Sequence, residues 1–126
     1  MKYKIFIVLW IIVIFILSSI SGNSLDKVPK INIPHFDKIV HFSMYSILQY
    51  LFLLKFSKNK CTISINKFLL ITSIFSVSYS ISLEFAQTYL FVKRSGDIFD
   101  VFANATGIIV IIVFYKFNIL KKLRLI

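Results

Sequence analysis

Polar side chains that could take part in chemistry recur at helical spacing in three separate stretches of this chain. Because residues three or four apart in an α-helix share a face, each set would form a polar face on one helix. These faces carry four of the five acidic residues of the chain and one imidazole. Such groups can hold a divalent ion or transfer protons. The three sets are Asp37, His41 and Tyr45; Glu84 and Gln87; and Asp97, Asp100 and Asn104.

Two kinds of chemistry are compatible with these sets. The carboxylates and His41 could bind a divalent ion, or His41, oriented by Asp37, could act as a general base while Arg94 binds a phosphate through two hydrogen bonds. The sequence names no cofactor and no particular metal, and without a motif for a nucleophile it leaves open whether the protein is an enzyme. The candidate catalytic residues are Asp37, His41, Glu84 and Asp100. The candidate ligand-binding residues are Gln87, Arg94, Asp97, Asn104 and Tyr45.

The composition places these residues in a membrane protein. A chain of 126 residues that is 58% hydrophobic and only 16% charged cannot bury its apolar surface in one small water-soluble core. We predict an all-α integral membrane four-helix bundle, formed as a single domain over residues 1–126. The expected spans are about 4–21, 37–54, 68–91 and 98–115. An alternative for the first span is a signal peptide cleaved near residues 21–23, which would leave three helices.

The distribution of charge predicts the orientation in the membrane. The net charge is +10, yet with four spans ten basic residues and no acids lie on one side, whereas five basic residues and all five acids lie on the other. The positive-inside rule therefore places both termini in the cytoplasm and the acids outside. Anionic lipid on the cytoplasmic leaflet accounts for the basic ends, so no nucleic-acid partner is expected.

The polar faces are expected to meet near the outer surface. The connection between the third and fourth spans, residues 92–96, is so short that these spans must form an antiparallel hairpin with adjacent polar ends. Hydrocarbon cannot satisfy polar groups, so the three faces should turn toward one another. Glu84 would lie within the helix, where an isolated charged carboxylate costs roughly 2.5 to 3.5 kcal/mol. We therefore expect it to be protonated or paired with Arg94 or another cation.

Three blocks of this sequence resemble the VanZ-like family of small bacterial membrane proteins. They are DKIVHFSMY at 37–45, EFAQ at 84–87 and RSGDIFDVFANATG at 94–107. The order and spacing of the blocks are similar to the family over nearly the whole chain, although the proline that often follows the Ser18–Ser19 pair is missing here. The resemblance implies a multi-pass protein of the bacterial cytoplasmic membrane. The family's namesake is associated with lowered susceptibility to the glycopeptide teicoplanin.

Three functional hypotheses follow from these observations. The polar site could modify a membrane lipid or a lipid-linked envelope precursor, or it could bind such an amphiphile without turnover. The aromatic residues Phe42, Tyr45, Phe85 and Tyr89 could then line a groove for an acyl chain. In the alternative, the protein is structural or serves in interactions, and its polar residues only hold the helices together. The sequence does not indicate the oligomeric state.

Overall fold

The computed structural model describes residues 2–20, 35–58, 62–90, 96–122 and 125. The polypeptide in these ranges is helical, without strands, and the all-α prediction is confirmed. The long helices correspond to the predicted spans, although α1 ends two residues before the expected boundary. The helices are α1 (Lys2–Ser19), α3 (Phe36–Lys58), α4 (Ile65–Tyr89), α5 (Ile98–Lys116) and the short α6 (Ile119–Lys122).

Three of these helices, α3, α4 and α5, are long and apolar enough to cross a membrane, whereas α1 contributes a shorter apolar stretch, Tyr3–Ser19. The 18 residues of α1 rise about 27 Å, close to the roughly 30 Å of a bilayer core. Large apolar side chains such as Phe6 and Ile74 point outward, with more than half of their surface exposed. Such a surface suits contact with lipid chains, and the four-pass topology stays a prediction.

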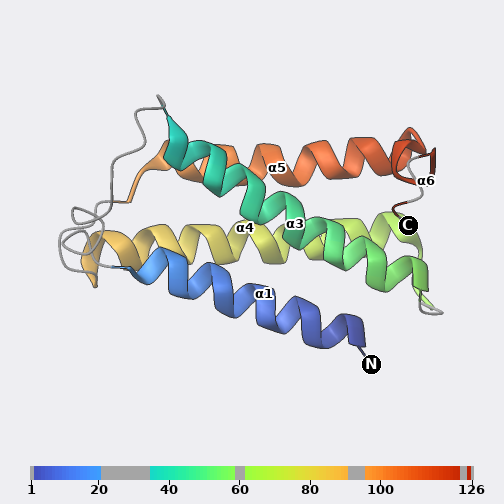
Figure 1. The fold of residues 1–126 in the computed structure, drawn as a ribbon, viewed down its shortest axis with the longest axis horizontal. Helices are drawn as coiled ribbons and strands as arrows, with labels where there is room; N and C mark the ends of the chain where they lie inside the picture. Colours follow the sequence, from blue (N-terminus) through green and yellow to red (C-terminus); the bar gives the residue numbers. More distant parts are fainter. Residues whose placement is uncertain (1, 21–34, 59–61, 91–95, 123–124, 126) are drawn as a thin grey trace.

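The helices are arranged so that the candidate residues gather at one end of the bundle. The N-terminus and the C-terminus lie at the opposite end (Figure 1). The end of α1, the start of α3, the end of α4 and the start of α5 share the candidate end. Helices α4 and α5 pack against each other as the predicted antiparallel hairpin. The chain direction alone therefore brings Asp37, Glu84 and Asp97 into the same region.

The most extensive helix pair is α3 with α5, and a glycine permits its close approach. A Cβ atom on Gly107 would collide with the carbonyl oxygen of Phe42 and lie 2.8 Å from the Ser46 Oγ atom. Gly96, just before α5, lies equally close to the Glu84 backbone and the Thr88 side chain. Small residues at helix interfaces let backbones approach in this way. These two contacts set the position of α5 against both of its neighbours.

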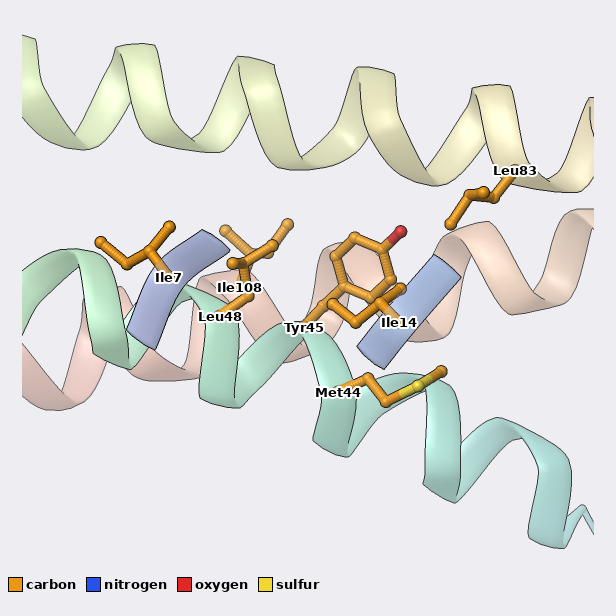
Figure 2. Close-up of a cluster of buried hydrophobic side chains, with 7 residues drawn as sticks. All are labelled: Ile7, Ile14, Met44, Tyr45, Leu48, Leu83 and Ile108. Atoms are coloured by element: carbon orange, nitrogen blue, oxygen red, sulfur yellow. The ribbon is translucent and has the colours of Figure 1, made fainter. Parts of the chain in front are cut away.

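The core between the helices is apolar, and α1 takes part in it. Figure 2 shows seven of its side chains meeting between the helices, namely Ile7, Ile14, Met44, Tyr45, Leu48, Leu83 and Ile108. Side-chain donors also hold α1 in place: Trp10 Nε1 donates to the Met44 carbonyl at 2.9 Å, and the Tyr79 hydroxyl donates to the Ile11 carbonyl at 2.9 Å. Helix α1 is therefore packed into the bundle along its length.

Candidate functional site

Lys38 occupies the centre of the polar end and pairs with three aspartates. Its Nζ atom lies 2.7 Å from Asp97 Oδ2, 2.9 Å from Asp100 Oδ1 and 3.0 Å from Asp37 Oδ2. These contacts join the first turn of α3 to the start of α5. The sequence interpretation counted Lys38 only as a charge. The signal that could have revealed its role is its place at the start of the second predicted span, on the side of the membrane that holds all five acids.

Asp97 links the end of α4 to the start of α5. Its side chain is the N-cap of α5 and accepts a hydrogen bond from the Phe99 N–H at 2.9 Å. Its own N–H donates to Glu84 Oε2 at 3.0 Å. A carboxylate at this position satisfies an unpaired helical donor and interacts favourably with the positive end of the helix dipole. Asp97, a candidate ligand-binding residue in the sequence analysis, thus has a structural role as a helix cap.

His41, Glu84 and Asp100 come together from α3, α4 and α5 and are buried. Their exposed fractions are 8%, 8% and 7%. His41 Nδ1 lies 3.9 Å from Glu84 Oε1, and His41 Nε2 lies 3.6 Å from Asp100 Oδ2. Both separations are longer than a hydrogen bond, and Nδ1 has no hydrogen-bond partner among the residues that the structure describes. His41 thus lies between the two carboxylates, and one ligand atom from each of the three residues lies within 4.8 Å of the others, in agreement with the predicted meeting of the three polar faces.

The remaining candidate residues lie at different depths. Asp37 is exposed, pairs with Lys38 and places a carboxylate oxygen within 4.8 Å of one from Asp100. Gln87 donates to the Ser18 carbonyl at 3.1 Å, and Asn104 donates to Ser80 Oγ at 2.7 Å. Tyr45 is only 1% exposed and belongs to the apolar core. Gln87, Asn104 and Tyr45 therefore lie between helices rather than on an open surface, while Arg94 lies outside the described residues.

A buried polar row on α4 continues from the site into the bundle. Its members are Thr72, Ser76, Ser80, Glu84 and Gln87. The sequence analysis predicted only its Glu84 and Gln87 end, and at the other end Thr72 takes the inward position while Ser73 is half-buried. Gln49 of α3, which the sequence interpretation did not consider, donates to Thr72 Oγ1 at 3.2 Å. This row ties α4 to its neighbours along most of the helix.

An apolar groove runs beside the site, between α4 and α5. Its volume is about 380 Å³. The lining is mainly apolar, and its residues are Ile81, Glu84, Phe85, Thr88, Tyr89, Gly96, Asp97, Ile98 and Val101. Of the aromatic residues considered for an acyl-chain groove, Phe85 and Tyr89 line this one. The carboxylates of Glu84 and Asp97 thus border this apolar groove.

A fall in pH is expected to lower the stability of the fold by neutralising the Asp97 carboxylate. The hydrogen bond from Lys38, followed by that from the Phe99 N–H, holds the pKa of Asp97 below its usual range. A depressed folded-state pKa means that the charged carboxylate stabilises the fold. This contribution is fully present above the pKa of an unfolded aspartate, about 3.9, and is lost as the pH falls through the folded-state value.

Thermal unfolding of the detergent-solubilised protein between about pH 6 and 3 checks this expectation against an Asp97→Asn variant. Asparagine caps helices as well as aspartate does but carries no charge. The parent should therefore lose more of its melting temperature on acidification than the variant. Equal losses would show that the Asp97 charge contributes nothing to the fold.

One comparison with known proteins gives a match. A model of the VanZ/LLP1 family matches residues 3–121 of the chain. Searches of curated proteins and of solved structures give no match. The matched region contains all of the clustered side chains described above.

Proposed function

The chain is a membrane protein of the VanZ/LLP1 family, and from this membership and the site geometry we propose that it binds an envelope lipid or a lipid-linked amphiphile. The polar head of the ligand lies at the cluster around Lys38, and its apolar chain lies in the groove between α4 and α5. We further propose a four-pass protein of the bacterial cytoplasmic membrane with both termini in the cytoplasm. The charge distribution of the sequence supports this orientation.

One observation carries the binding proposal: two of the charged side chains around Lys38 and His41 also line the apolar groove. Glu84 and Asp97 line the groove, and they are joined to each other by the hydrogen bond from the Asp97 N–H. A ligand with a polar head and an apolar chain can therefore occupy both regions at once. Exposed Phe85 and Ile98, each 63% exposed, would extend the apolar wall toward the surrounding lipid.

The chemistry of the cluster limits the head groups that it accepts. Among its described side chains, Asp37, Asp97 and Asp100 pair with Lys38, and the Glu84 carboxylate lies near His41. Heads with amino or hydroxyl groups can donate hydrogen bonds to these carboxylates. An effect on teicoplanin-type glycopeptides belongs to the same proposal, because such an antibiotic is itself an amphiphile with a lipid tail that could compete for the groove.

Blocking the groove is expected to abolish lipid retention. Ile81 lines the groove and is 53% exposed, whereas Ile74 lies two turns earlier on α4 and is 58% exposed outside it. An Ile81→Trp variant should lose a lipid that copurifies with the parent by at least tenfold in native mass spectrometry. The Ile74→Trp variant should retain it. Equal retention by both variants would contradict the proposal.

The same preparation separates binding from modification. The parent protein is incubated with the retained lipid in nanodiscs. The lipid is then extracted, and its molecular mass is measured by mass spectrometry. An unchanged mass identifies a binding protein. A new product that the Ile81→Trp variant does not form identifies an enzyme acting on that lipid.

The ion pairs of Lys38 favour a second candidate, a purely structural role for the polar residues. They connect α3 to α5, as the Asn104 to Ser80 hydrogen bond connects α5 to α4. In that case the parent and both tryptophan variants retain the same bulk lipids, and only substitutions within the ion-pair network change the stability of the protein.

A further inference from the structure

We propose that His41, Glu84 and Asp100 bind a divalent transition-metal ion such as Zn²⁺ or Mn²⁺. This metal site does not depend on the proposed lipid function. Each of the three residues offers one ligand atom, and these atoms lie within 4.8 Å of one another. The three side chains come from three different helices and are buried.

The distances suit an ion better than direct hydrogen bonds. Two ligands that each lie about 2.1 Å from a metal are roughly 3 to 4 Å apart. His41 Nδ1 lies 3.9 Å from Glu84 Oε1, and His41 Nε2 lies 3.6 Å from Asp100 Oδ2. One ligand atom from each of the three residues lies within 4.8 Å of the others, so an ion bound to one imidazole nitrogen requires the carboxylate at the other nitrogen to turn toward it.

His41 supplies an independent indication of a ligand. Its Nδ1 atom is buried and has no hydrogen-bond partner within the described parts of the chain, although buried polar atoms are nearly always satisfied. The ring is only 8% exposed, so bulk water does not compensate. A metal ion bound between the three side chains would satisfy a nitrogen for which the described residues supply no partner.

Both carboxylates are oriented by groups outside the proposed centre. Asp100 accepts from Lys38 through Oδ1 and turns Oδ2 toward His41. Glu84 accepts from the Asp97 N–H through Oε2 and turns Oε1 toward His41. Outer hydrogen bonds of this kind fix the ligands of metal sites and are important for metal affinity. Lys38 and Asp97 are therefore positioning residues in this proposal.

The type of ligand selects the type of ion. Imidazole suits zinc and other transition metals, whereas Ca²⁺ takes six to eight oxygen ligands and Mg²⁺ retains much of its water. Three protein ligands leave a coordination position open, as in catalytic zinc sites. A pocket of about 220 Å³ between α1 and α3, lined in part by Asp37 and His41, gives an ion or a ligand a route to this centre.

Metal binding is tested on the tag-free full-length protein in nanodiscs, stripped with a chelator and titrated with Zn²⁺ by calorimetry. We expect about one bound ion per chain and a preference of at least tenfold over Mg²⁺ and Ca²⁺. A His41→Asn variant should lose at least tenfold in affinity. The matched control is His35→Asn, because His35 is exposed and its positive φ of 57° is one that asparagine tolerates.

A spectroscopic measurement separates loss of the ligand from loss of the fold. Bound Mn²⁺ should show electron spin-echo modulation from a directly coordinated nitrogen in the parent and in His35→Asn, but not in His41→Asn. An Asp37→Asn variant distinguishes the neighbouring set of Asp37, Asp97 and Asp100, which could also approach an ion. Absence of stoichiometric Zn²⁺ binding, or binding that is sensitive to Asp37 but not to His41, would overturn the proposal.

Discussion

A Gly107→Leu protein is expected to yield little or no folded bundle. The added side chain would begin at a Cβ that already collides with the Phe42 carbonyl oxygen and lies 2.8 Å from Ser46 Oγ. Ordinary overpacking of a core costs about 1 to 3 kcal/mol, but here the obstacle is helix backbone, which cannot rotate away. Leucine is also a better helix former than glycine by nearly 1 kcal/mol, so any loss must come from the contact with α3.

The matched control for this prediction is the neighbouring residue on α5. Thr106 is exposed and bonds only to its own helix, through the Phe102 carbonyl at 2.8 Å. A Thr106→Leu protein should elute and melt like the parent in size-exclusion chromatography and thermal circular dichroism, whereas Gly107→Leu should aggregate or unfold at low temperature. Normal elution and melting of Gly107→Leu would mean that Gly107 of α5 does not pack directly against the Phe42 backbone of α3.

A Lys38→Met protein is expected to fold with a clearly lower melting temperature. Among the described lysines and arginines, Lys38 alone forms ion pairs with Asp97 and Asp100, and the Asp100 side chain is only 10% exposed. Removing one partner of a buried ion pair leaves an uncompensated charge. Because Lys38 itself is partly exposed, we expect a smaller loss than for a fully buried pair, on the order of 5 to 10 °C.

Two further substitutions identify the cause of that loss. Lys38→Arg keeps the charge and should restore part of the stability, although a planar guanidinium fits three separate carboxylates less well than an ammonium. Lys58, exposed at the other end of α3, provides the control, and Lys58→Met should melt within about 2 °C of the parent, as is usual for surface substitutions. Equal melting temperatures of the Lys38→Met and Lys58→Met proteins would show that the ion pairs of Lys38 do not stabilise the fold.

Much of the site could be predicted from the sequence because helices are local structures. The four-residue spacing of Asp37 and His41 places both on one face of any helix that contains them. The short connection before Asp97 forces α4 and α5 to be antiparallel neighbours. The proximity of His41, Glu84 and Asp100 follows from these two facts together with the cost of exposing polar groups to lipid.

The partners of the polar residues could not be predicted in the same way. Lys38 is adjacent to Asp37 in the sequence, yet its two shortest ion pairs reach across to α5. Gln87 and Asn104 were treated as ligand contacts, whereas in the structure they donate to Ser18 and Ser80. Periodicity gives the face of a helix, but the rotation and axial offset of neighbouring helices decide which groups come within hydrogen-bonding distance.

The sequence by itself determined that this protein is helical, apolar and polar at one end, because hydrophobic length and helical period depend only on the order of residues. The tertiary structure decided how the polar end is organised. The close approach of α5 to α3 at Gly107 accompanies the contact of Lys38 with Asp97 and Asp100. Interhelical packing, which no single segment encodes, thus selects the partners of each charge.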